Sequence, residues 1–358
     1  MKNYPKALEF SKRFNLAVPI IQAPMAGADN NDLVMKVNQA GALGSRGMGY
    51  MQVEKLLDDL NVLKTENITN FNVNLFVPQK ITQDITCHDF NRKVEKLKKY
   101  LICICDELEI DLNTLKLFDP QKRFEEQFAV VLDNNIPILS TTFGTLSSSA
   151  IMQCHKKDIY LIGTATTLDE AKKHEALGYD AVVMQGIEAG GHRGGFQETS
   201  LVSQMTLDLL IESVLPEIKI PIIAAGGIRS VSIADNYLEK GVSALQIGTA
   251  FLACENCTSI SNAYRELLHS QKEIINITPA ISGRNARGIQ NQLFILLEKY
   301  YNDYPEDRLM YPFIHLITAP IRKKAALLNN AQYIAAWSGE SSDNLDKKTV
   351  AEFVNTFL

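Results

Sequence analysis

Short apolar segments alternate with amphipathic stretches along most of the chain. Each apolar segment is rich in β-branched or small apolar residues and ends in a glycine or a polar break, which is typical of a strand. The stretches between them repeat their apolar positions with a helical period and predict helices, as at 31–39, 53–63, 168–177 and 231–240. The predicted strands occupy residues 19–25, 42–47, 71–77, 136–143, 160–166, 181–186, 220–226 and 244–251.

Strands that alternate with helices predict a parallel sheet joined by right-handed crossovers. The strand segments are almost continuously apolar, as expected of strands that are buried on both faces. A doubly wound open sheet would share this alternation, but eight strands followed by a helical tail favour closure. We therefore predict an α/β fold, a (β/α)₈ barrel of the TIM type.

Two stretches interrupt the alternation and suggest how the chain is divided. Residues 79–135 are too long for a simple crossover and show helical patterns at 90–101 and 120–132, so we expect a helical insertion after the third strand. After the eighth strand we expect helices around the turn SGRNARG at 282–288, and a closing helix at 319–336. The predicted parts are a barrel at 1–258, a helical extension over its mouth at 259–318, and a closing helix with a tail at 319–358.

Composition excludes several classes of partner. The 358 residues carry a net charge of −5, with a pI near 5.8 and no basic stripe, so nucleic acid is not an expected partner. No apolar segment approaches the ~20 residues that span a bilayer, and the N-terminus lacks the apolar core of a signal peptide. We expect a cytoplasmic protein without a membrane partner, as a monomer or homodimer.

The cysteines predict free thiols rather than a disulfide framework or a metal site. Six cysteines are dispersed over a long chain, which suits a reducing compartment. Cys254 and Cys257 form a C-x-x-C pair, but no second pair or histidine cluster accompanies them, so we interpret both as structural. No metal is expected.

Two glycine-bearing strand ends predict a phosphate site. Chemistry in such barrels lies at the carboxyl ends of the strands, where Gly226 and Gly227 follow the seventh strand and Gly248 follows the eighth. Either site alone is more often a tight turn, but phosphates typically bind after these two strands, where small residues let backbone amides approach an anion. Neither a G-x-G-x-x-G nor a Walker sequence is present, so a mononucleotide such as FMN fits best.

The loop after the sixth strand carries the candidate catalytic group. It reads QGIEAGGHRGG at 185–195 and places His192 at the barrel mouth, where an imidazole could take a proton from carbon or stabilise an oxyanion. A lone histidine is more often structural, but the other five lie in helical or connecting stretches. Glu188 and Arg193 could orient the loop, bind substrate or form a surface ion pair. The amides of Asn74 and Gln185 could together bind a flavin ring, although either one alone is more often a cap or a satisfied buried amide.

Seven motifs together resemble a known family. They are PIIQAPMAG, FNVNLF, QGIEAGGHRG, IPIIAAGGI, LQIGTAF, GRNARG and a late WSG, in this order. The chain resembles the nitronate monooxygenases over nearly its full length, and QGIEAGGHRG is the most specific motif. The resemblance implies an FMN-dependent barrel that oxidises alkyl nitronates, with propionate 3-nitronate as one candidate, to carbonyl compound and nitrite with O₂. It also implies a role in detoxification.

The resemblance assigns site residues by position. His192 falls on the active-site histidine, as a base toward neutral nitroalkanes or as a group that positions the nitro function. Many members carry a histidine near Thr142 and a glutamine at Glu340, so these two departures bear on the substrate. The implied FMN contacts are Ala23, Pro24, Met25, Asn74, Gln185, Gly190, Gly191, Gly226, Gly227, Gln246, Gly248 and Thr249.

Two alternatives stay open. A flavin-dependent enoyl-acyl-carrier-protein reductase shares the barrel and the histidine loop but takes hydride from a nicotinamide. QAPMAG, GRNARG and WSG favour the monooxygenase. A non-catalytic flavin-binding barrel would be expected to lack His192.

Overall fold

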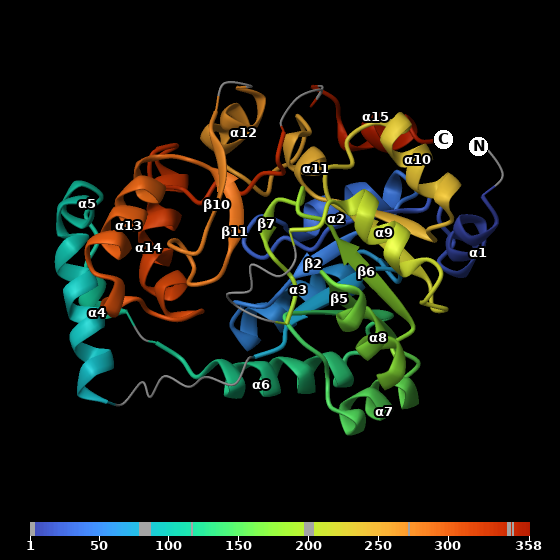
Figure 1. Ribbon diagram of the computed structural model, residues 1–358, viewed down its shortest axis with the longest axis horizontal. Coiled ribbons are helices and arrows are strands. Elements are labelled where there is room, and N and C mark those ends of the chain that lie inside the picture. Colours follow the sequence, from blue (N-terminus) through green and yellow to red (C-terminus); the bar gives the residue numbers. More distant parts are fainter. Residues whose placement is uncertain are drawn as a thin grey trace.

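Eight parallel strands form a nearly closed barrel in the computed structural model (Figure 1), which describes residues 4–78, 87–115, 117–196, 204–270, 273–341, 345 and 347–358. The order of neighbouring strands is β1-β9-β8-β6-β5-β4-β3-β2, and a bridge between Ile21 and Leu43 brings β1 beside the segment that leads into β2. The predicted barrel is confirmed, and each predicted strand segment contains one strand. Their bounds are β1 Ile20–Gln22, β2 Ser45–Gly47, β3 Asn72–Phe76, β4 Ile138–Thr142, β5 Tyr160–Ala165, β6 Ala181–Gln185, β8 Ile222–Ala225 and β9 Ala244–Ile247.

The helices around the barrel begin and end at residues with clear local signals. Side chains of Asn30, Ser147, Thr167 and Ser230 accept a backbone N–H of the first turn, as N-caps do. Both α8 and α10 end at glycines in the left-handed conformation, Gly178 and Gly241. The predicted helix ranges 31–39, 168–177 and 231–240 match the structure. The helices are α2 Asn31–Gln39, α3 Val53–Thr65, α7 Ser148–Lys156, α8 Leu168–Leu177, α9 Leu207–Val214, α10 Val231–Lys240 and α11 Thr249–Ala253.

Helix α1 (Pro5–Arg13) closes the amino-terminal end of the barrel. Phe10 of this helix belongs to the cluster of buried residues formed by alternate strand positions such as Ile162 and Val183. Phe14, just after the helix, packs edge-on against Tyr160, the first residue of β5, with ring centroids 5.0 Å apart. This end is filled by side chains, so the open end is the one at the carboxyl ends of the strands.

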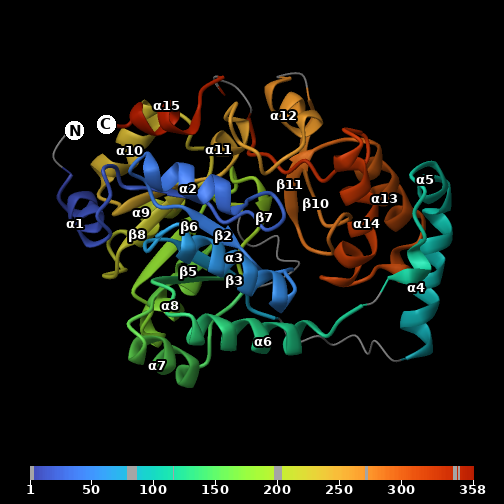
Figure 2. The same ribbon diagram turned by 180° about the vertical axis from the view of Figure 1, so that it is seen from behind.

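The helices of the insertion after β3 pack against two different parts of the protein, the barrel and the C-terminal extension (Figures 1 and 2). Helix α6 (Pro120–Asp133) packs along α3 and β3, where Gln127 donates to the carbonyl of Met48 at 2.7 Å. Helices α4 (His88–Tyr100) and α5 (Ile102–Glu107), with the short η1 (Leu112–Thr114), come before it. In both views α4 and α5 lie beside α13 and α14 instead of the barrel. Lys96 of α4 pairs with the buried Asp307 at 2.5 Å.

The C-terminal part differs from the prediction in two places. The turn at 282–288 was expected between helices, but antiparallel strands flank it, because the alternating β-branched residues of β10 pair with β11. The closing helix expected at 319–336 starts earlier, at Phe313, with Pro320 inside it, and ends at Leu327, just before Asn329 adopts a left-handed conformation. The elements are α12 Asn262–His269, β10 Ile275–Thr278, β11 Ala286–Ile289, α13 Gln292–Asp303, η2 Pro305–Asp307, α14 Phe313–Leu327 and α15 Val350–Asn355.

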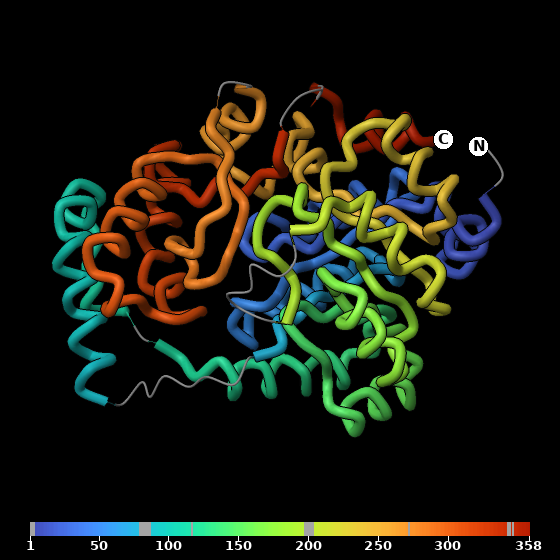
Figure 3. The backbone as a smooth tube through the Cα atoms, in the orientation of Figure 1, coloured from blue at the N-terminus to red at the C-terminus, as the bar shows by residue number. Residues whose placement is uncertain are grey.

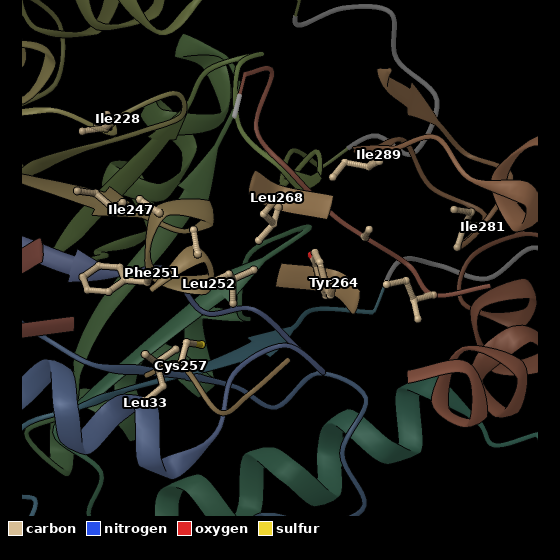
Figure 4. Close-up of a cluster of buried hydrophobic side chains, with 14 of the residues drawn as sticks. Leu33, Ile228, Ile247, Phe251, Leu252, Cys257, Tyr264, Leu268, Ile281 and Ile289 are labelled. Carbon is tan, nitrogen blue, oxygen red and sulfur yellow. The ribbon is translucent and has the colours of Figure 1, made fainter. Parts of the chain in front are cut away.

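A short strand outside the barrel sheet joins the barrel to the C-terminal extension. Strand β7 (Gly191–His192) lies in the loop after β6 and pairs with β11, so that His192 faces Ala286 in a three-stranded sheet β10-β11-β7. The path of this loop toward the C-terminal strands can be followed in Figure 3. A continuous apolar core also connects the barrel with the extension. Figure 4 shows part of it, including Ile247, Phe251, Tyr264, Leu268, Ile281 and Ile289.

A buried ion cluster holds the loop that follows β1. Arg46, which is 4% exposed, pairs with the carboxylates of Asp29 and Asp59. Asp29 also accepts hydrogen bonds from the backbone N–H of Met25 at 2.5 Å and of Gly47 at 2.8 Å. Burial raises the pKa of Asp29 to about 6, against the lowering effect of Arg46. The cluster therefore ties the loop around Met25 to the end of β2.

Replacing Arg46 with Met should lower the free energy of unfolding by about 3–5 kcal/mol, because the buried Asp29 would lose its cation and the buried Asp59 would lose one of two. Lys55→Met is the matched control, since Lys55 pairs with the same Asp59 at 2.6 Å but is 62% exposed. The control should cost less than about 1 kcal/mol. Urea denaturation of both variants measures the difference. Equal losses would contradict this account of the cluster.

Candidate functional site

A cavity of about 780 Å³ lies at the carboxyl ends of the barrel strands, between the barrel and the C-terminal extension. The predicted site residues come from five barrel strands, β1, β3, β6, β8 and β9, and the loops after them, and the structure brings all of them to the wall of this cavity. They are Ala23, Pro24, Met25, Asn74, Gln185, Gly190, Gly191, His192, Gly226, Gly227, Gln246, Gly248 and Thr249. The departure position Thr142 lines the same wall.

The end of the cavity at β8 and β9 combines exposed backbone with a cation. Gly226 and Gly227 adopt φ values of +126° and +65°, which favour glycine. The next polar side chain, Arg229, donates to the carbonyl of Gly227 at 3.2 Å, and its buried Nε has no partner among the described residues. A Cβ added to Gly248 would make only ordinary contacts, at 3.5 Å, with Ala23 and Met25. Packing within the protein therefore does not explain Gly248.

The two predicted amides are held firmly in the wall. Asn74 donates to the hydroxyls of Ser140 at 2.9 Å and Thr142 at 3.1 Å. Gln185 accepts from the backbone N–H of Gly194 at 2.8 Å and donates to the carbonyl of His192 at 3.0 Å. Both residues line the cavity, and both amides are satisfied by hydrogen bonds within the protein. Contact with a flavin ring stays a prediction.

Charged side chains orient the glycine-rich loop. Arg193 donates to the carbonyls of Gln185, at 3.1 Å, and Gly186, and burial lowers the pKa of Arg193 to about 10. Glu188 accepts from the backbone N–H of Leu207 through both oxygens, at 3.0 and 2.9 Å. These contacts are those expected of residues that orient the loop.

The segment after α14 covers this loop from the other side. A Cβ on Gly190 would lie 2.5 Å from the carbonyl carbon of Ser338, so only glycine allows this approach. The backbone N–H of Gly339 donates to the hydroxyl of Thr249 at 3.0 Å. Glu340 contributes its backbone N–H, 3.0 Å from the carbonyl of Glu188, while its residue surface is exposed. The departure at Glu340 therefore lies at the rim and not inside the cavity.

His192 lies half-buried among aromatic rings. Its ring centroid is 5.5 Å from that of Trp337, 5.8 Å from Phe143 and 5.9 Å from Tyr311. Burial, followed by the positive charges of Arg284 and Arg322, lowers the pKa of His192 to about 3. The imidazole is therefore neutral at physiological pH, which leaves one ring nitrogen able to accept a proton.

The wall opposite the barrel carries polar residues that sequence reasoning missed. His315 of α14 stacks on Tyr50 with ring centroids 3.7 Å apart, and Arg322 donates to the His315 carbonyl at 2.7 Å. Burial lowers the pKa of Arg322 to about 10, and no ion pair links this guanidinium to a carboxylate of the described residues. Lys323 also lines the cavity. No aspartate or glutamate does so in the described part of the chain. Tyr50, His315 and Arg322 lie outside the recognised motifs, so no local signal marked them.

The structure also bears on the other expectations drawn from the sequence. All six cysteines are free thiols, and Cys254 and Cys257 are buried in the core. Within the described ranges, no three histidine, cysteine or acidic side chains are grouped as a metal site would require. No helix in those ranges is long and apolar enough to span a membrane.

Comparison with known proteins places this chain in a family. The family model described as nitronate monooxygenase matches residues 9–358. The chain belongs to the nitronate monooxygenase family. A probable nitronate monooxygenase of Staphylococcus saprophyticus is 34% identical over 332 residues, which are 91% of this chain and 90% of the relative. The resemblance inferred from the motifs is confirmed, and the chain is an oxidoreductase of this family.

Solved structures agree with this membership. Nitroalkane oxidase from Streptomyces ansochromogenes has a TM-score of 0.83 at 29% identity, covering 97% of this chain and 96% of that one. FabK from Thermotoga maritima has a TM-score of 0.72 at 19% identity, covering 98% and 95%. The second likeness shows the fold alone.

The stability of the flavin-free protein should report the neutral His192 ring. An unfolded histidine binds a proton near pH 6.5, whereas His192 in the folded chain binds one near pH 3. Between these values the unfolded chain holds the extra proton, so this contribution to stability is lost as the pH falls from 6.5. As the pH is lowered, the free energy of unfolding of His192→Gln should therefore fall less steeply than that of the original protein. The two slopes should differ by up to about 1.4 kcal/mol per pH unit.

Urea denaturation at pH 7, 6, 5 and 4 measures this slope. His88→Gln, at an exposed position, provides the control and should follow the original protein. A His192→Gln curve parallel to that of the original protein would refute the depressed pKa of His192.

Proposed function

We propose that this protein is an FMN-dependent nitronate monooxygenase that converts alkyl nitronates and O₂ to carbonyl compounds and nitrite. The observation that carries the proposal is the cavity itself. It joins a glycine-rich, cationic end to a neutral histidine, and it has Arg229, Arg322 and Lys323 but no carboxylate among its described lining residues. Such a lining attracts anions and suits both a phosphate and a nitronate.

The barrel side of the cavity suits FMN. Gly226, Gly227 and Gly248 leave room for a phosphate against backbone, and the unpartnered Nε of Arg229 offers a charged donor there. Asn74, Gln185 and Gln246 would lie along the flavin ring, with Ala23, Pro24, Met25, Gly190, Gly191 and Thr249 completing the contacts. When bound, the flavin supplies the oxidising group. The protein residues bind, orient and shield the substrate beside it.

The extension side suits the substrate. A nitronate is an anion, and Arg322 faces the cavity without a carboxylate partner, so burial of this charge is best compensated by a negative ligand. Lys323 adds a second positive charge near the mouth. Two charges favour a nitronate that also bears a carboxylate, such as propionate 3-nitronate, with the carboxylate bound by Arg322. Removal of such a reactive anion in the cytoplasm would be a detoxifying reaction.

Aerobic turnover tests this proposal. Flavin-loaded protein is mixed with propionate 3-nitronate, and nitrite release and O₂ uptake are followed. A parallel reaction with NADH or NADPH and an enoyl thioester tests the reductase alternative. Nitrite and O₂ uptake with the nitronate alone support the proposal. Nicotinamide-dependent loss of the enoyl group would overturn it, and no turnover in either reaction would favour a non-catalytic barrel.

Gly248→Ala should separate flavin binding from folding. The added methyl group meets only ordinary contacts within the protein, so the unfolding midpoint should stay within about 3 °C. The same methyl group would obstruct a phosphate, and the Kd for FMN should rise about tenfold or more. Fluorescence titration with FMN and with riboflavin measures this, and riboflavin, which lacks the phosphate, should lose less. An unchanged Kd for FMN would remove Gly248 from the phosphate site.

Arg322→Gln should change substrate preference. Loss of a charge-assisted contact of about 1.5–3 kcal/mol predicts a KM for propionate 3-nitronate raised roughly tenfold to a hundredfold. The KM for propyl-1-nitronate, which has no carboxylate, should change by less than about threefold. Lys324→Gln removes the same charge from the same helix outside the cavity and serves as the control. Equal increases for both nitronates would show that Arg322 does not bind the carboxylate.

A further inference from the structure

The turn between β10 and β11 touches the candidate catalytic histidine through Ser282. We propose that Ser282 is a positioning residue that fixes the tautomer of His192, so that Nδ1 carries the lone pair at the cavity and removes a proton from neutral nitroalkanes. The inference rests on the proposed function. The family resemblance already implies that His192 is a base toward neutral nitroalkanes, and Ser282 is the residue that we infer directs this base. It also gives a role to the SGR segment of the turn.

The hydrogen bonds of Ser282 determine where the protons lie. Its Oγ is 2.9 Å from Nε2 of His192, 3.0 Å from the carbonyl oxygen of Arg284 and 3.3 Å from the backbone N–H of Arg284. Two oxygen atoms 3.0 Å apart repel each other unless a proton lies between them, and a carbonyl has no proton to donate, so the single hydroxyl proton points to Arg284. Oγ must then accept from Nε2–H of His192. A neutral imidazole has one N–H, so Nδ1 is the unprotonated nitrogen.

The remaining nitrogen of His192 is available to a ligand. Nδ1 makes no hydrogen bond with the described residues, and His192 lines the cavity. The charged and titratable groups that act on the ring are Arg284, from the same turn, and Arg322 and His315, from α14. None of the three is an acid that would hold the ring as an imidazolium. Nδ1 of His192 is thus unprotonated, and the contact between Nε2 and Ser282 directs it.

The surroundings of Ser282 keep this contact in place. Ser282 is completely buried, and the next residue, Gly283, has a φ of +90°. A Cβ at Gly283 would lie 2.4 Å from the backbone nitrogen of Tyr311, so the turn is packed tightly against the start of α14. Four residues beyond Ser282, Ala286 pairs with His192 in the sheet. The serine and the histidine are therefore held from both the turn and the strand.

The proton transfer balances without another reactant. The C–H bond next to the nitro group breaks, a bond from Nδ1 of His192 to hydrogen forms, and the electron pair moves onto the nitro oxygens. The product pair is a nitronate and an imidazolium whose Nε2–H still donates to Ser282. The burial and the positive charges that keep His192 neutral also make it a weak base, so neutral nitroalkanes should react more slowly than nitronates.

Ser282→Ala tests the inference, with Ser338→Ala as the matched control. Ser338 is also completely buried, and its Oγ has no partner among the described residues. In Ser282→Ala the kcat/KM for nitroethane should fall about tenfold to a hundredfold, while that for ethylnitronate should change by less than about threefold. Ser338→Ala should leave the ratio of the two values unchanged. Equal losses on nitroethane and ethylnitronate in Ser282→Ala would overturn the inference.

Nitrogen-15 NMR of histidine-labelled protein gives a second readout that needs no turnover. The original protein should show His192 protonated at Nε2 only, and Ser282→Ala should show a mixture of tautomers. Protonation at Nδ1 in the original protein would overturn the inference even if nitronates are oxidised. If no nitro compound is oxidised, the proposed function fails, and the NMR result still decides the role of Ser282.

Discussion

The site depends on the pairing of β7 with β11, which joins the loop after β6 to a strand about ninety residues later in the chain. A two-residue strand cannot persist alone, and this one is held by further contacts. Arg287 donates to the carbonyl of Ile187 at 3.0 Å, and Arg284 donates to that of Gly195. Without this pairing the barrel would still present a glycine-rich end, but His192 would lose both Ser282 and its aromatic neighbours.

The electrostatics of the cavity follow from the same arrangement. The C-terminal extension places Arg284 and Arg322 near His192, and the barrel adds Arg229 at the other end of the cavity. Burying guanidinium groups is costly, and backbone carbonyls compensate for part of that cost. The rest remains as a positive potential in a cavity whose described lining has no carboxylate. Burial and this charge pattern together keep the histidine neutral, and the same charges favour an anionic ligand.

Sequence reasoning succeeded where the signal is local. Apolar strands, N-caps such as Asn30 and glycines such as Gly178 mark element boundaries within a few residues, so the barrel and three helix ranges were predicted correctly. The glycines after β8 and β9 and the loop carrying His192 were placed on one wall because carboxyl ends of parallel strands share one edge. The structure brings these residues to one cavity, and their chemical roles remain predictions.

Elements and contacts that depend only on tertiary packing could not be predicted from the sequence. Strands β10 and β11 have four residues each, and their pairing with β7 is invisible to a local pattern. The amphipathic pattern of α4 does not reveal which part of the protein the helix packs against. In the structure, Arg92 and Lys96 of α4 pair with Asp307 of the C-terminal extension. Arg322 resembles any cation on an amphipathic helix until α14 is packed over the barrel mouth.

The most direct test of the account is a single-turnover experiment without oxygen. Purified flavin-loaded protein is mixed anaerobically with propionate 3-nitronate or with NADH or NADPH, and the flavin absorbance is followed. A nitronate monooxygenase should lose the oxidised flavin spectrum rapidly with the nitronate and keep it with either nicotinamide. Rapid bleaching by NADH or NADPH, with no change on addition of the nitronate, would contradict the proposed function.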